Sequence, residues 1–193
     1  MEPEILAAIE PVIDVFQDLD IAYYIGGSLA SSAFGVARAT LDVDLIADIR
    51  RSHVPTLCQR LGGQYYIDET MVEQAVEARS SFNVVHLDSM IKLDVFVVKD
   101  APFHQEALKR RIQETLALEP EARLFFLPTP EDIVLFKLQW YEEGDRVSDR
   151  QWNDVLGIIR VQGRKLDFDY LNRWAEHLGL RKLLDEAEKE ARL

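Results

Sequence analysis

The sequence predicts an α+β protein in two parts, residues 1–128 and residues 129–193. Short β-rich stretches with apolar residues at every second position recur through the first part. One of these stretches runs directly into the turn Gly26-Gly27-Ser28. After Pro128-Thr129-Pro130 the pattern becomes wholly helical, so we expect a helical C-terminal subdomain behind a stiff boundary.

In the first part, residues 3–19 show an amphipathic helical pattern, which Pro11 should kink or restart. A strand is expected at 21–25, a short helix from Ser28, and a second strand at 41–46. The later pattern predicts helices at 52–61, 69–78 and 102–109, and strands at 82–87, 91–98, 111–118 and 123–127.

The second part begins with Thr129 as an N-cap and Pro130 at the first helical position. Helices are expected at 129–141, 148–162, 167–178 and 180–192, separated by glycines. We expect them to pack against the first part because the connection is short and holds two prolines.

The turn Gly26-Gly27-Ser28 is suited to binding an anion. Glycines let the backbone turn sharply and bring its N–H groups close to a ligand. The Ser28 hydroxyl can cap the helix that follows, and the positive end of that helix can hold a triphosphate.

Asp42 and Asp44 are expected on one face of a strand, because side chains alternate with a period of two. Paired carboxylates repel each other unless a cation lies between them, and oxygen ligands suit Mg²⁺, with Mn²⁺ as a substitute. Asp94 lies in another apolar strand, beside Lys92 on its polar face, and is the candidate third ligand.

Each motif alone is weak, since Asp-x-Asp occurs in turns and calcium loops and Gly-Gly in ordinary tight turns. The glycines are not followed by Lys-Ser or Lys-Thr, and the chain has no Gly-x-Gly-x-x-Gly, so P-loop and Rossmann sites are excluded. The histidines show no metal-ligand spacing, and the single cysteine, Cys58, is expected in the core.

Composition places the chain among ordinary globular proteins, with 48% hydrophobic and 29% charged residues. No run of eighteen apolar residues and no signal-peptide pattern is present, so we expect a cytoplasmic protein without membrane contact. The net charge of -12 disfavours extended nucleic-acid binding. It favours a small substrate, a protein substrate, or an RNA held by a local surface such as Lys109-Arg110-Arg111.

The Gly-Gly-Ser turn, the Asp42-Val43-Asp44 strand and the later Asp94 strand together resemble the nucleotidyltransferase superfamily, which has a DNA polymerase β-like fold. The resemblance covers about residues 20 to 100 and implies a mixed sheet flanked by helices. It implies that Asp42, Asp44 and Asp94 are catalytic residues that hold Mg²⁺, and that Gly27 and Ser28 bind the phosphates of an NTP.

Two further blocks look like the abortive-infection type E toxin branch of that superfamily: the stretch from Arg38 to Asp44, and the stretch from Thr129 to Leu138 with 149–155 after it. This similarity implies that Arg38 and Lys137 bind the nucleotide near the leaving pyrophosphate. It also implies an antitoxin protein as partner. The chain has Asn153-Asp154 where that branch commonly has Lys-Asp.

Two hypotheses follow. The first is an Mg²⁺-dependent enzyme that transfers a nucleoside monophosphate from NTP to a hydroxyl of RNA such as tRNA, a protein or a small molecule, as a toxin or otherwise. The second is an inactive protein of the same fold that binds nucleotide or a partner. The presence of Asp42, Asp44 and Asp94 favours the enzyme.

Overall fold

The computed structural model describes residues 3–37, 40, 42–116 and 122–191. The chain divides into two compact units. Unit 1 comprises Met1–Leu29 and Ala39–Leu127, and unit 2 comprises Ala30–Arg38 and Pro128–Leu193. The helix α2, Gly27–Phe34, therefore starts in unit 1 and ends in unit 2, a sharing that the sequence does not indicate.

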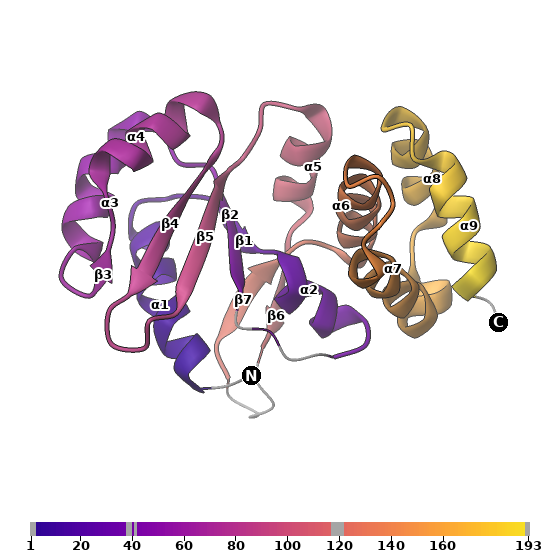
Figure 1. Ribbon diagram of the computed structural model, residues 1–193, viewed down its shortest axis with the longest axis horizontal. Coiled ribbons are helices and arrows are strands. Elements are labelled where there is room, and N and C mark those ends of the chain that lie inside the picture. The colour runs from indigo at the N-terminus through magenta and orange to yellow at the C-terminus, as the bar shows by residue number, and fades with distance from the viewer. Residues whose placement is uncertain (1–2, 38–39, 41, 117–121, 192–193) are drawn as a thin grey trace. The chain divides into compact units, whose positions relative to one another are not determined.

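Unit 1 is built on a five-stranded sheet with the order β1-β2-β5-β4-β3 (Figure 1). Its strands are β1 Tyr23–Ile25, β2 Val43–Ala47, β3 Tyr65–Tyr66, β4 Ser81–His86 and β5 Lys92–Val97. β2 and β5 are parallel, and the other neighbouring strands are antiparallel. This mixed sheet, with helices around it and a helical C-terminal part, confirms the predicted fold class.

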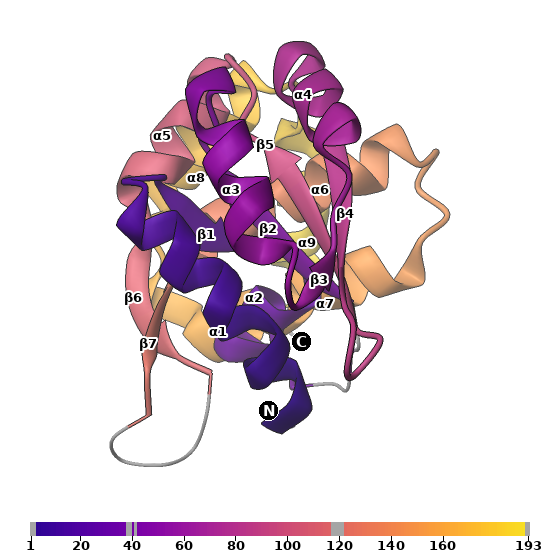
Figure 2. The ribbon, with the colours of Figure 1, turned by 90° about the vertical axis from the view of Figure 1, so that its left-hand side faces the viewer.

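Three helices lie on one face of this sheet: α1 Pro3–Asp18, α3 Val54–Leu61 and α4 Glu69–Ala78 (Figure 2). α1 continues through Pro11, so the predicted restart of the helix is wrong. Its apolar face is buried on both sides of the proline, at Ile5, Ile9, Val12, Ile13 and Phe16. Burial of these side chains offsets the cost of about 3 kcal/mol that a proline imposes inside a helix.

The stretch predicted as one helix at 52–61 is divided, because a 3-10 turn at Arg51–His53 precedes α3. Farther along the chain, α5 Pro102–Arg110 is followed by a two-stranded sheet of β6 Ile112–Thr115 and β7 Leu124–Leu127. These two strands confirm the β pair expected at 111–127. The pair lies beside β1, where the rings of Tyr23 and Phe126 meet edge to face with centroids 5.6 Å apart.

Unit 2 contains α6 Pro130–Glu143, α7 Asp149–Gln162, α8 Phe168–His177 and α9 Arg181–Ala191. The side chains of Thr129, Ser148 and Asp167 accept N-cap hydrogen bonds at the starts of α6, α7 and α8. The end of α2 belongs to the same unit, where the Gln162 amide donates to the Phe34 carbonyl at 2.7 Å. Within the described ranges, no helix has both the length and the apolar character needed to cross a membrane.

Candidate active site

A row of polar side chains crosses three strands of the five-stranded sheet. In the parallel pair β2 and β5, Asp44 is the register partner of Asp94. In the antiparallel pair β4 and β5, Asn83 is the partner of Asp94 on the other side. The flanking Val43 and Leu93 are fully buried, so the polar row takes the opposite face of the sheet. Two carboxylates 50 positions apart in the chain thereby become neighbours.

Gly26 and Gly27 bring the start of α2 against Asp44 of β2. The Gly26 N–H donates to the Asp44 carbonyl at 2.8 Å. Gly27 has a φ of +56°, and a Cβ added there would stand 1.7 Å from Asp44 Oδ2. Both the backbone angle and this close approach require glycine. The next residue, Ser28, is buried, with 6% of its surface exposed. The predicted phosphate turn and the predicted metal-binding strand are therefore in direct contact.

Asp42 lies immediately before β2 and is exposed, since the strand begins at Val43, two residues after the predicted start at position 41. The Thr40 hydroxyl accepts a hydrogen bond from the Asp42 N–H at 3.2 Å, and this bond shapes the entry into the strand. Asp44, the second acid of the pair, is partly exposed within the strand.

Asp94 is held by two donors. The Lys92 ammonium lies 2.9 Å from Asp94 Oδ2, and the Asn83 amide donates to Asp94 Oδ1. The hydrogen bond and the charge of Asp94 raise the pKa of Lys92, and the charges of Asp42 and Asp44 add to this shift against a small opposing effect of desolvation. One ammonium thus experiences the field of all three predicted acids.

The residue types of this face fit a divalent cation such as Mg²⁺, which takes hard carboxylate oxygens. Gly27 brings its backbone directly against the Asp44 carboxylate, where a larger side chain would displace that carboxylate. Among the residues that the structure describes, no three His, Cys, Asp or Glu side chains are grouped so that they could hold a metal as they stand. The Lys92 ammonium instead occupies an Asp94 oxygen at 2.9 Å.

Two predicted residues remain, Arg38 and Lys137. Arg38 is outside the described residues. Lys137 lies on α6 in unit 2, is 3% exposed, and makes an ion pair with Asp154 of α7 at 2.9 Å. The Lys137 ammonium also lies 5.7 Å from the centre of the Trp140 ring.

The structure adds Lys92 and Asn83 to the set of functional candidates. Lys92 could be found from sequence, since it is two residues from Asp94 and so shares its strand face. Asn83 could not, because its place beside Asp94 follows from the pairing of β4 with β5.

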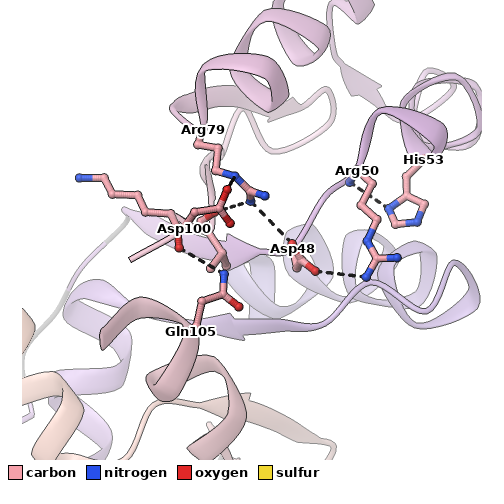
Figure 3. Close-up of polar contacts among 8 residues, drawn as sticks. Asp48, Arg50, His53, Arg79, Asp100 and Gln105 are labelled. Atoms are coloured by element: carbon pink, nitrogen blue, oxygen red, sulfur yellow. Dashed lines mark hydrogen bonds and ion pairs between the residues drawn. The ribbon is translucent and has the colours of Figure 1, made fainter. Parts of the chain in front are cut away.

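A second polar cluster fixes the other ends of the parallel strands (Figure 3). Asp48 follows β2 and Asp100 follows β5, and Arg79 lies between them. The Arg79 guanidinium is 2.7 Å from Asp100 Oδ2 and 3.8 Å from Asp48 Oδ1, and it donates to the Val98 carbonyl at 2.7 Å. These contacts hold the carboxyl ends of β2 and β5 together and so support the register that sets Asp44 opposite Asp94.

No protein-family model matches the chain, and no curated protein does. Solved structures do match. The solution structure of the antibiotic-resistance factor ANT(2'')-Ia aligns with a TM-score of 0.57 and 15% identity over 100% of this chain and 97% of that chain. The crystal structure of ANT(2'')-Ia in complex with adenylyl-2''-tobramycin aligns with a TM-score of 0.57 and 16% identity, over 92% and 98%.

An antigenic nucleotidyltransferase-like protein from Paracoccidioides brasiliensis aligns with a TM-score of 0.53 and 17% identity over 98% of this chain and 94% of that chain. The chain has a nucleotidyltransferase fold. These similarities run along nearly the full length of each neighbour, so the nucleotidyltransferase fold includes the helical unit as well as the sheet.

Proposed function

We propose that the protein is a nucleotidyltransferase that transfers a nucleoside monophosphate from an NTP to a hydroxyl of a small molecule. The observation that carries the proposal is the contact of Gly27 with Asp44. It joins the phosphate turn to the row formed by Asp44, Asp94 and Asn83, which we call the carboxylate row. The nucleotidyltransferase fold supports this reaction class. We assign the chemistry to residues 1–128, which contain this row, and treat residues 129–193 as the helical subdomain.

The start of α2 is the proposed site for the triphosphate. The N–H groups at a helix start are partly positive and unused by the helix itself, and they suit an anion. Gly27 and Ser28 occupy this position, and Gly27 lets the backbone lie directly against the Asp44 carboxylate. Arg38 and Lys137 are proposed to neutralise the leaving pyrophosphate, as the sequence pattern predicts. Lys137 could do so only by giving up its ion pair with Asp154.

Asp42, Asp44 and Asp94 are the proposed ligands of Mg²⁺ or Mn²⁺. Such an ion, when bound, neutralises phosphate charge and lowers the pKa of a coordinated hydroxyl. The three carboxylates also have roles of their own in the proposal. Asp44 contacts the phosphate turn and Asp42 lies just before the same strand, so both are proposed to serve the nucleotide side. Asp94 comes from the neighbouring strand and is proposed to orient the acceptor hydroxyl and to take its proton.

In the proposed reaction the acceptor oxygen forms a bond to the α-phosphorus, and the bond from that phosphorus to the bridging oxygen breaks. Pyrophosphate leaves with the electron pair, and the proton of the acceptor hydroxyl passes to Asp94. Alignment of the two oxygens and neutralisation of charge are the main protein contributions to such transfers.

A small acceptor is favoured over RNA by charge and by the neighbours. The net charge of -12 repels a polyanion. ANT(2'')-Ia, which shares the fold, is known in complex with adenylyl-2''-tobramycin, a modified small molecule. A toxin role with an antitoxin partner, implied by the abortive-infection resemblance, is the narrower form of the proposal.

The test is nucleotidyl transfer with α-labelled ATP, CTP, GTP and UTP in Mg²⁺ against four acceptor classes: tobramycin, uncharged polyols, tRNA and a protein extract. We expect a small molecule that gains the mass of one NMP, with release of pyrophosphate. Asp44→Asn should lower the rate by about 100-fold or more. Asp18→Asn is the matched control, since Asp18 lies at the end of α1 with 60% of its side chain exposed, and it should retain activity.

The inactive alternative has one observation in its favour, namely that Asp94 is already paired with Lys92 and Asn83. It predicts binding of NTP with metal but no labelled product from any acceptor. That outcome would replace the enzyme by a nucleotide-binding protein, whereas labelled tRNA or protein would support the toxin form.

A further inference from the structure

Lys92 lies on the carboxylate face of the sheet, two residues before Asp94 on β5. Its side chain is half exposed, at 51%, while that of Asp94 is 22% exposed. The ammonium contacts Asp94 Oδ2, and the Asn83 amide contacts Asp94 Oδ1. Both oxygens of the proposed third metal ligand therefore have protein donors.

The charge of Lys92 acts on more than its nearest partner. Lys92 shares the strand face of Asp94, and the register sets Asp44 directly beside Asp94, so the Lys92 charge acts on this pair of carboxylates. Directly opposed like charges destabilise a sheet, and Asp44 and Asp94 are such a pair. An ammonium within this group offsets their repulsion.

We propose that Lys92 is a built-in counter-cation that holds Asp94 while no metal is bound, and that a divalent ion must displace the Lys92 ammonium to reach Asp94. This inference rests on the proposed function, because it takes Asp94 as a metal ligand. Lys92 stays protonated throughout and only changes its partner. The protein then tolerates Asp44 and Asp94 side by side without metal, at the expense of a lower metal affinity.

The geometry sets the two cations in competition for Asp94. A divalent ion such as Mg²⁺ would stand about 2.1 Å from a carboxylate oxygen. The ammonium lies 2.9 Å from Asp94 Oδ2, so a metal on that oxygen would stand within a few ångströms of a like charge. The two cations repel each other at such a separation. Asn83, which is neutral and contacts the other oxygen, can keep its hydrogen bond in both states.

The experiment compares Mn²⁺ affinity, measured by calorimetry with Mn²⁺ alone, in the full-length wild type, Lys92→Met and Lys92→Arg. Lys92→Met should bind Mn²⁺ about three- to ten-fold tighter, since a half-exposed ion pair contributes modestly. Lys92→Arg keeps the charge and should stay near the wild type. Lys99→Met removes an exposed charge just beyond the same strand, and it should change the affinity by less than about twofold.

The same comparison in an Asp94→Asn background separates displacement from a general effect of charge. There Lys92→Met should no longer raise the affinity. An equal rise with and without Asp94 would overturn the proposal, because Lys92 would then act through the field at Asp42 and Asp44. An unchanged affinity in Lys92→Met would also overturn it.

The melting temperature gives an independent measurement, and it remains informative for a variant whose folded state is less stable. Without metal, Lys92→Met should melt below the wild type, and saturating Mn²⁺ should close the gap. A deficit that persists in Mn²⁺ would mean that the ion pair is only structural. Mn²⁺ binding in the wild type without an effect of Lys92 would defeat this inference alone. No Mn²⁺ binding in any variant, with or without NTP, would defeat the proposed metal site together with it.

Discussion

Gly27→Ala would test the contact on which the proposed site depends. The new Cβ would stand 1.7 Å from Asp44 Oδ2 and 2.7 Å from Asp44 Cγ. Real Cβ atoms essentially never approach other heavy atoms closer than 3.0 Å. Either the Asp44 carboxylate or the first turn of α2 must therefore move, and each movement separates the phosphate turn from the carboxylate.

Two terms contribute to the expected loss. The φ of +56° at Gly27 should cost an alanine about 1–2 kcal/mol of unfolding free energy. Relief of the contact with Asp44 adds a further amount of the same order. The affinity for Mn²⁺ with NTP should fall at least about tenfold, which is about 1.4 kcal/mol, because Asp44 and the backbone N–H groups no longer face one ligand.

Two glycines serve as controls in urea denaturation and calorimetry. Gly179 has a φ of +72° with no atom within 4 Å of an added Cβ, so Gly179→Ala isolates the backbone term. Gly63 has open space and no positive φ, so Gly63→Ala should be nearly neutral. The reasoning is refuted if Gly27→Ala binds Mn²⁺ and NTP like the wild type, or loses no more stability than Gly179→Ala.

Three further changes have defined outcomes. Lys137→Met should lower the free energy of unfolding, measured by urea denaturation, by about 3–5 kcal/mol, because it leaves the Asp154 charge buried. Adding Asp154→Leu should recover most of this loss. A loss below about 1 kcal/mol in Lys137→Met would contradict a buried pair. Arg79→Met should lower the free energy of unfolding by about 1 kcal/mol, because the hydrogen bond to the Val98 carbonyl is lost. Arg50→Met, which removes only an exposed ion pair, should lower it by less than about 0.5 kcal/mol. Equal losses would show that the cluster in Figure 3 does not fix the strands. Burial, with smaller contributions from nearby acids, raises the pKa of Cys58 from 9.0 to about 11. The protonated thiol therefore stabilises the folded chain by up to about 2.7 kcal/mol, an effect that is complete below pH 9 and is lost as pH rises through about 11. Cys58→Ala should flatten the dependence of unfolding free energy on pH over that range, and an unchanged slope would contradict a buried thiol.

The faces of the two acidic strands could be predicted from the sequence because the signal is local. Alternation of apolar residues in β2 and β5 sets Asp44 and Asp94 on polar faces. The capped helices of the second part follow local rules in the same way, with Thr129 at the start of α6.

The order of the strands could not be predicted, because it depends on pairing between distant segments. After β2 the chain forms β3 and β4, and β5 then inserts between β2 and β4. This insertion alone gives Asp94 its two register partners, Asp44 and Asn83. The crowding of Gly27 against Asp44 likewise depends on where α2 packs, which no periodicity encodes.

The carboxylate row also links ligand binding to stability. Asp44 and Asp94 face each other across parallel strands, an arrangement that like charges disfavour. The fold offsets this cost with the Lys92 ammonium and the Asn83 amide. A divalent ion bound with NTP would neutralise the same charges and bind only the folded chain, so it should stabilise by about 2.7 kcal/mol at a hundred times its dissociation constant. Thermal stability would therefore report occupancy of the site even when the acceptor is unknown, and loss of that stabilisation in Asp44→Asn would identify the carboxylate row as its origin.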